Sequence, residues 1–240
     1  MDPISVAAAA GMRARMESLD LLANNIANAS TSGYKSDSEF YTLFSSQNSD
    51  SGTTLPLIKN QWTDYSQGLL QPTNEQLDFA LSGRGFFAVQ GPSGPLYTRN
   101  GNFRLSPTGV LVNSEDYVVR SVDGRPLRAD VSRPVEVSAD GTVRQGEQVI
   151  GQMELVDFAD RAVLAKQGNN YFRNTDLRAR PALATAQVQQ GRIENSNVGA
   201  AESAVRLVTV MRQFEILQKA VTLAGEMNRK AVEEVARVNQ

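Results

Sequence analysis

The sequence of 240 residues contains no cysteine and no histidine. The lack of cysteine excludes disulfides, a thiolate nucleophile and cysteine-bound metals. The lack of histidine removes the commonest general base and metal ligand, and with it every Ser-His-Asp arrangement. We therefore expect no catalytic residues, no metal site and no cofactor, and we expect that the protein is not an enzyme.

Other common signals are also missing. Basic residues are not in excess, with 24 Lys and Arg against 26 Asp and Glu, so the charge gives no sign of a nucleic-acid partner. No apolar run approaches the ~18 residues of a membrane span, so we expect no membrane insertion. The apolar run over residues 6–10 is short and follows no Lys/Arg-led region, unlike a secretion signal. If the protein leaves the cytoplasm, it does so without an ordinary cleaved signal.

A heptad pattern occupies the C-terminal stretch, where apolar residues alternate at spacings of three and four. Asn228 is the one polar member, and it either fixes the register or meets solvent. Apolar neighbours at Met211, Ala220, Met227 and Val232 widen the stripe beyond what one partner helix covers, which indicates packing on several sides. The predicted assembly seam is Leu207, Val210, Phe214, Leu217, Val221, Ala224, Asn228, Ala231, Val235 and Val238.

A second pattern of the same kind occurs at the N-terminus. It predicts a helix over about residues 4–28, with Asp2 and Pro3 as start signals and a turn cluster that ends at Gly33. The seam residues here are Ala9, Met12, Met16, Leu19, Ala23 and Ile26. The simplest solution for two such seams is that the ends of the chain pair with each other, either antiparallel or parallel.

The middle of the chain has a different character. All nine prolines stand at Pro3 or between Pro56 and Pro181, and short β-like runs alternate with turn signals such as Asn100-Gly101. We therefore predict an α+β fold in which long N- and C-terminal helices pair as a coiled coil around an inserted antiparallel all-β domain. The expected segments are an N-terminal helix (1–35), an irregular extended connection (36–76), the all-β domain (77–177), a return connection (178–191) and a C-terminal helix (192–240).

Gly83-Arg84-Gly85-Phe86-Phe87-Ala88 matches the letters of a dinucleotide-binding motif. Such a site needs its glycines between a strand and a helix, where the helix amides meet the pyrophosphate. The residues that follow favour a strand instead, so we expect a turn or bulge at the two glycines and no bound nucleotide.

Several segments resemble the flagellar rod and hook proteins. Residues 19–35 are similar to the N-terminal pattern of that family, L-D-x-x-A-N-N-x-A-N-x-x-T-x-G-[FY]-K, and the matching positions are Leu19, Asp20, Ala23, Asn24, Asn25, Ala27, Asn28, Thr31, Gly33, Tyr34 and Lys35. The C-terminal pattern is matched by Ser196, Asn197, Val198, Arg212, Phe214 and Glu215, with Gln213 in place of the usual Ala or Ser. Residues 77–87 and 97–103 resemble the middle of the same proteins.

The resemblance implies a structural subunit of the bacterial flagellar basal-body rod, located in the periplasm. In that family the subunits pass through the flagellar type III export apparatus and then stack helically with copies of themselves and with other rod proteins. Their terminal helices line an axial tube that transmits torque. The short stretch from Tyr41 to Leu77 favours the proximal over the distal rod type. The distal type stays an alternative, as does a soluble coiled-coil oligomer that displays a β binding domain.

Overall fold

The computed structural model describes residues 3–45, 54–168, 170–176 and 178–238. These residues form two compact units. The helical unit comprises residues 1–27, 37–64 and 199–240, and the β unit comprises residues 28–36 and 65–198. No helix within the described ranges is both long and apolar enough to cross a membrane.

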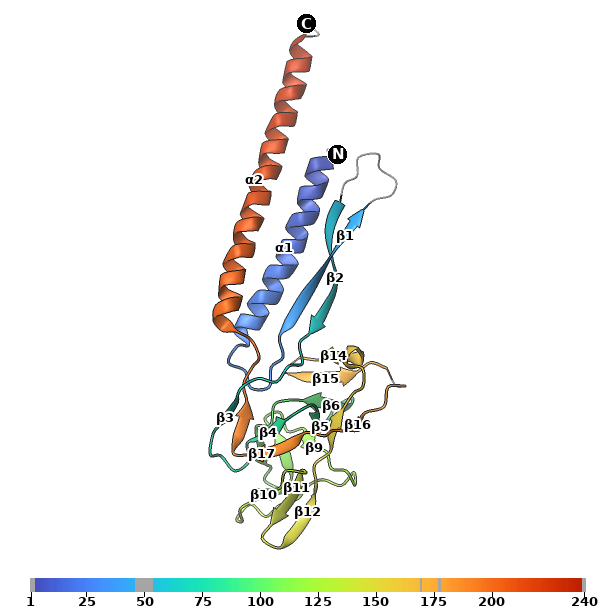
Figure 1. Ribbon diagram of the computed structural model, residues 1–240, viewed down its shortest axis with the longest axis vertical. Coiled ribbons are helices and arrows are strands. Elements are labelled where there is room, and N and C mark those ends of the chain that lie inside the picture. The colour runs from blue at the N-terminus through green and yellow to red at the C-terminus, as the bar shows by residue number, and fades with distance from the viewer. Residues whose placement is uncertain (1–2, 46–53, 169, 177, 239–240) are drawn as a thin grey trace. The chain divides into compact units, whose positions relative to one another are not determined.

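The helical unit contains two long helices that contact each other, α1 (Pro3–Ala27) and α2 (Ala200–Val238). They run antiparallel (Figure 1), which confirms the predicted pairing of the chain ends and decides its direction. The contact is close, because a Cβ placed on Gly11 of α1 would lie 3.3 Å from Cδ1 of Leu217 on α2. At ~1.5 Å per residue, the 25 residues of α1 span about 37 Å and the 39 residues of α2 about 58 Å.

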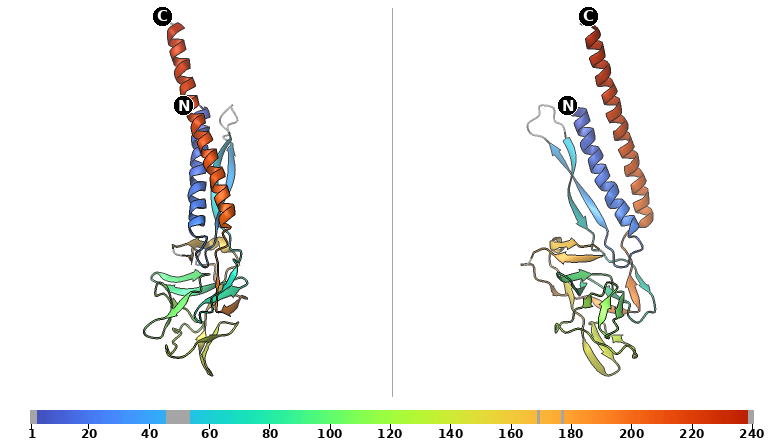
Figure 2. Two further views of the ribbon diagram at one scale, coloured as in Figure 1. Left: turned by 90° about the vertical axis from the view of Figure 1, so that its left-hand side faces the viewer. Right: turned by 180° about the vertical axis from the view of Figure 1, so that it is seen from behind.

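A β-hairpin completes the helical unit. Strands β1 (Asp37–Ser45) and β2 (Thr54–Thr63) pair antiparallel, with a register shift between Phe40 and Tyr41. Helix α1 lies between this hairpin and α2 (Figure 2). We had expected an irregular connection over 36–76, because its many polar residues hide the alternation of a strand. The hairpin forms nevertheless, since its two strands satisfy each other's backbone groups and lie against α1.

The β unit consists of short strands whose pairings among the described residues are all antiparallel, as predicted. The largest sheet has the path β14-β15-β6-β5-β9-β8-β7, and β13 joins it beside β5. The strands are β3 (Leu70–Pro72), β4 (Phe79–Ser82), β5 (Phe86–Gly91), β6 (Gly94–Thr98), β7 (Phe103–Leu105), β8 (Leu111–Asn113), β9 (Val118–Val119), β10 (Glu136–Val137), β11 (Thr142–Gln145), β12 (Gln148–Gln152), β13 (Leu155–Asp157), β14 (Leu164–Lys166), β15 (Tyr171–Asn174), β16 (Ala182–Leu183), β17 (Gln187–Gln190) and β18 (Arg192–Glu194), with a 3₁₀ turn at Arg161–Val163.

The core of the β unit includes residues from the segment predicted as a return connection. Ala186 and Val188 are buried in the same cluster as Phe79 and Leu81. They are held there because β17 pairs with β4, and β18 pairs with β3. The segment before α2 is therefore an integral part of the β unit.

The two glycines of the GxGxxA sequence lie between strands β4 and β5. Gly83 and Gly85 have φ angles of +106° and +152°, in the region that favours glycine. They make the expected turn before a strand, and no helix follows to receive a pyrophosphate.

Candidate functional site

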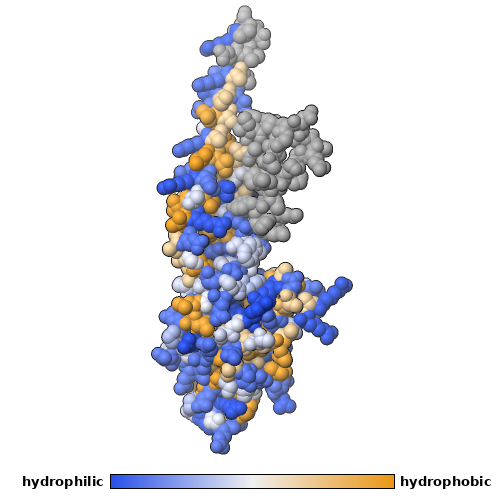
Figure 3. All heavy atoms as spheres, in the orientation of Figure 1, coloured by the Kyte–Doolittle hydropathy of each residue, from blue (hydrophilic) through white to orange (hydrophobic). Residues whose placement is uncertain are grey.

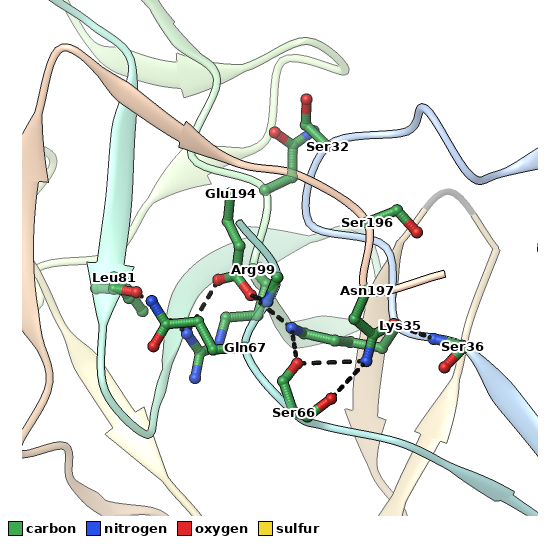
Figure 4. Close-up of polar contacts among 12 residues, drawn as sticks. Ser32, Lys35, Ser36, Ser66, Gln67, Leu81, Arg99, Glu194, Ser196 and Asn197 are labelled. Carbon is green, nitrogen blue, oxygen red and sulfur yellow. Dashed lines mark hydrogen bonds and ion pairs between the residues drawn. The ribbon is translucent and has the colours of Figure 1, made fainter. Parts of the chain in front are cut away.

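The most buried polar cluster of the β unit is formed by Lys35, Arg99 and Glu194 (Figure 4). Oε1 of Glu194 accepts a hydrogen bond from Nζ of Lys35 at 2.5 Å, and Oε2 accepts one from Nη1 of Arg99 at 3.1 Å. The backbone N–H of Gly68 also donates to Oε1 at 2.9 Å. The Lys35 and Glu194 side chains have no exposed surface, and Arg99 has almost none. We call these three residues the ionic clasp.

Backbone carbonyls accept further hydrogen bonds from the two cations. Nζ of Lys35 donates to the carbonyl of Ser66, and Nη2 of Arg99 donates to the carbonyl of Gly83 at 2.7 Å. The Arg99 guanidinium also lies 5.6 Å from the centre of the Phe86 ring. Burial lowers the pKa of Arg99 from its ordinary value, while the Glu194 carboxylate opposes that shift. The clasp holds two cations and one anion in a dry interior, so it depends strongly on Glu194.

The clasp joins the two family-like signatures of the sequence. Lys35 ends the N-terminal signature, and Glu194 stands just before the C-terminal one. The backbone N–H of Gly33 donates to the Glu194 carbonyl at 2.7 Å, and that of Ser36 donates to Oδ1 of Asn197 at 2.8 Å. Helix α2 begins only at Ala200, and the Asn197 side chain binds the N-terminal segment.

Other residues of the N-terminal signature shape the turn that follows α1. Gly33 has a φ of +70°, and a Cβ there would lie 2.3 Å from the backbone nitrogen of Asn100. The buried ring of Tyr34 lies 4.3 Å from the ammonium of Lys166. In the helical unit, the side chain of Asn25 receives the N–H of Asp37 and donates to its carbonyl. These contacts explain why Gly, Tyr and Asn stand at these positions.

The predicted seam of α2 coincides with the least exposed face of this helix. Val210 and Ala224 are buried, while Asn228 and Ala231 are exposed. Four further seam residues are half-buried: Leu207, Phe214, Leu217 and Val221. Val235 and Val238 lie in the helix, but their side chains are outside the described residues. The seam thus faces α1 over its first half, and its role in assembly stays a prediction.

On α1 most of the buried stripe lies one position earlier than the predicted seam. Met12, Leu19 and Ile26 are half-buried, whereas Ala9, Met16 and Ala23 are exposed. The buried positions are Ala8, Gly11, Ala14, Ser18, Leu21, Leu22 and Asn25. The apolar periodicity missed this stripe because it includes glycine and polar residues. The assembly role of the exposed seam residues stays a prediction.

A buried carboxylate explains Ser18, one of the two polar members of that stripe. Glu39 of β1 accepts a hydrogen bond from Oγ of Ser18 at 2.7 Å and another from Nη2 of Arg206 at 3.1 Å. Its side chain thereby links the hairpin to α1 and to α2. Sequence reasoning had not singled out Glu39, because a lone acidic residue in a polar stretch carries no recognisable pattern.

Helix α2 also bears a second apolar stripe, which is exposed. Successive residues of a helix are rotated by ~100° about its axis. On this basis the residues of the second stripe lie about 120° around α2 from the centre of the predicted seam. Figure 3 shows hydrophobic residues along the outer face of α2. Val205, Ile216, Ala220, Leu223 and Met227 form this second stripe, and each of them is exposed. One helix partner, α1, therefore leaves much apolar surface of α2 uncovered.

The described residues contain no group of three or more acidic side chains placed to hold a metal ion. The buried polar residues of the ionic clasp bind one another and hold the fold together, which is typical of a structural protein. Comparisons with known proteins agree with that class. Three family models match the chain in order: "Flagella basal body rod protein" over residues 7–35, "Flagellar hook protein FlgE/F/G D1 domain" over 80–145, and "Flagellar basal body rod FlgEFG protein C-terminal" over 189–234.

Individual relatives span almost the whole chain. The flagellar basal-body rod protein FlgF of Caulobacter vibrioides is 33% identical over 227 aligned positions, which cover 92% of this chain and 93% of that protein. The rod protein FlgG of Buchnera aphidicola subsp. Baizongia pistaciae is 30% identical over 261 positions, covering 96% and 98%. This chain belongs to the flagellar basal-body rod FlgE/F/G family. It is a structural subunit of the flagellar basal-body rod and not an enzyme.

Proposed function

We propose that this chain is a subunit of the proximal rod that polymerises helically through its terminal helices. The product is an axial tube in the periplasm that transmits torque. Its partners are copies of itself and other rod proteins, and it reaches its place through the flagellar type III export apparatus. The family membership supports the rod, and the surface of α2 supports the manner of assembly.

The observation that carries the proposal is the second apolar stripe of α2. Ile216 and Leu223 are about 60% exposed, on a helix whose other apolar face already contacts α1. A soluble helix usually turns a single apolar stripe toward its core. Two stripes suit a helix that packs between its own partner and a neighbouring copy, and a stack of such copies would bury the second stripe throughout.

The proximal assignment rests on length. The alignment to the Buchnera FlgG has 261 positions against the 240 residues of this chain, so at least 21 positions of that relative have no counterpart here. The alignments to FlgF of C. vibrioides and of Mesorhizobium japonicum have 227 and 223 positions. Neither alignment is longer than this chain of 240 residues. Identities of 33% and 30% to two FlgF proteins overlap those of 30% and 31% to two FlgG proteins, so the distal type stays the second candidate.

Two experiments test the proposal. Leu223→Asp should lower incorporation into basal bodies and motility by more than about tenfold, because it places an unpaired charge in a buried contact. Thr222→Asp is the matched control, since this neighbouring residue is exposed outside both stripes, and it should stay motile. Normal motility with Leu223→Asp would contradict assembly through α2. Complementation of strains that lack either the proximal or the distal rod protein separates the two types.

A further inference from the structure

An apolar groove of about 460 Å³ opens on the β unit. Met153 and Leu155 are buried core residues that form part of its lining. Leu183 and Val122 also line it, and they are 77% and 52% exposed. A groove whose apolar rim is open to water is a typical binding surface for another apolar side chain.

The exposed rim of the groove lies on a sheet edge. Leu183 belongs to strand β16, which pairs with β13 through only two residues, Leu183 with Val156 and Ala182 with Asp157. Among the described strands, β16 has no partner on its other side. Both its backbone edge and its apolar side chain are therefore available to another chain.

A matching apolar projection lies on the opposite flank of the same unit. Leu69 is 75% exposed and directly precedes β3. Strands β3 and β16 stand on opposite flanks of the β unit (Figures 1 and 2). A groove and a projection on opposite flanks cannot meet within one chain, but they can meet between successive copies.

The charges beside the two surfaces are complementary. The exposed carboxylate of Asp140 lines the groove and is held by the N–H and hydroxyl of Thr142 at 3.0 and 2.7 Å. On the other flank, the exposed Arg192 of β18 stands opposite Pro72 of β3. A copy that inserts Leu69 into the groove would bring an arginine toward an aspartate.

We infer that the groove beside β16 receives the Leu69 flank of a second copy of this chain. The contact is head-to-tail, because it joins two different surfaces, and contacts of this kind generate open helical polymers or rings. The inference rests on the proposed polymer and adds a second layer of contacts to it, between β units.

Cysteine crosslinking tests this directly, since the native chain has no cysteine. Leu69→Cys and Thr185→Cys chains are expressed together in cells that lack the native protein, and an oxidant is added. We expect a disulfide-linked dimer only when both variants are present, at about tenfold the yield of a Ser93→Cys and Thr185→Cys control. Gln71→Cys on β3 replaces Leu69→Cys if the latter fails to assemble.

Motility and the mixed dimer, measured together, separate a failure of the inference from a failure of the proposed function. Motile cells without the mixed dimer would overturn the head-to-tail contact and leave the rod assignment standing. A dimer formed by Leu69→Cys alone would also overturn it, because it indicates a symmetric contact. If the native chain itself does not enter basal bodies, the rod assignment and the inference fall together.

A charge exchange supplies independent support. Asp140→Arg or Arg192→Asp alone should lower the yield of the mixed dimer about two- to fivefold, as expected for an exposed ion pair. The two changes combined should restore the yield. Equal yields from all the variants would contradict the proposed pairing of these charges.

Discussion

Nζ of Lys35 donates a 2.5 Å hydrogen bond to Oε1 of Glu194, a residue 159 positions later in the chain, and neither side chain is exposed. This bond lies at the point where the two signature segments of the family meet. The segments that carry the family signature therefore have a structural role first, because their contact closes the β unit.

Glu194→Gln should strongly destabilise the β unit. The substitution keeps the shape of the side chain but removes the carboxylate charge that both buried cations, Lys35 and Arg99, contact. Breaking a buried pair in this way costs about 3–5 kcal/mol. Urea unfolding followed by near-ultraviolet circular dichroism measures the change. Glu147→Gln, at an exposed position, should have almost no effect, and equal effects of the two variants would contradict the importance of the clasp.

Gly33→Ala should cost more than Gly124→Ala. The two glycines have similar φ angles, +70° and +74°. Both substitutions therefore incur a strain of about 1 kcal/mol, because a side chain is disfavoured at a positive φ. At Gly33 a Cβ would also collide with backbone atoms of Arg99 and Asn100, whereas at Gly124 it meets open space. Thermal unfolding measures the two melting temperatures, and their difference gives the contribution of the steric clash at Gly33. Equal melting temperatures would show that the turn relaxes freely.

The stability of the β unit should fall in alkaline solution. Burial raises the pKa of both Tyr97 and Tyr171 above the ordinary value of 10.0. A raised pKa in the folded state means that the stabilisation is complete below the unfolded pKa and is lost as the pH rises through the folded one. Each tyrosine can therefore lower the free energy of unfolding by up to about 1.4 kcal/mol per pH unit above pH 10.

Denaturant midpoints measured between pH 8 and 12 test this dependence. Tyr171→Phe should flatten the decline while lowering stability at pH 8, because Nδ2 of Asn113 loses the hydroxyl to which it donates at 2.6 Å. A profile for the variant that declines as steeply as that of the native chain would contradict the role of Tyr171.

Hydrogen exchange should differ along α2. Residues 207–224 include the seam positions that are buried or half-buried, whereas Asn228 and Ala231 are exposed. In the isolated chain we expect slow exchange over the first stretch and fast exchange over residues 226–238. Gly225→Ala meets no steric hindrance and should raise helix stability by about 1 kcal/mol, which would slow exchange on its C-terminal side. Uniform protection along α2 would contradict a helix with an uncovered end.

The fold class could be predicted from the sequence because its signals are local. Alternating spacings of three and four mark both helices, and turn pairs such as Asn100-Gly101 and Asp140-Gly141 divide the middle into strands. The hairpin over residues 37–63 was missed, since its polar residues hide the strand period. The strand partners of residues 187–194 could not be predicted either. These residues pair with β3 and β4, which lie more than 100 positions earlier in the sequence.

The contact faces of the two helices and the ionic clasp could be predicted only in part. The seam of α2 emerged from apolar spacing alone, because leucine, valine and phenylalanine form its contact with α1. The buried stripe of α1 did not, because Gly11, Ser18 and Asn25 belong to it and carry no apolar signal. Of the ionic clasp, Lys35 belongs to the N-terminal signature, but Glu194 matched no motif and nothing in the sequence linked either residue to Arg99.

The most direct test of the central claim is an electron cryomicroscopy map of isolated basal bodies that contain this subunit. We predict that α2 lies in the wall of the axial tube, with Ile216 and Leu223 buried against a helix of a neighbouring subunit. A map in which this stripe faces open solvent, or in which the subunit lies outside the rod, would contradict the claim.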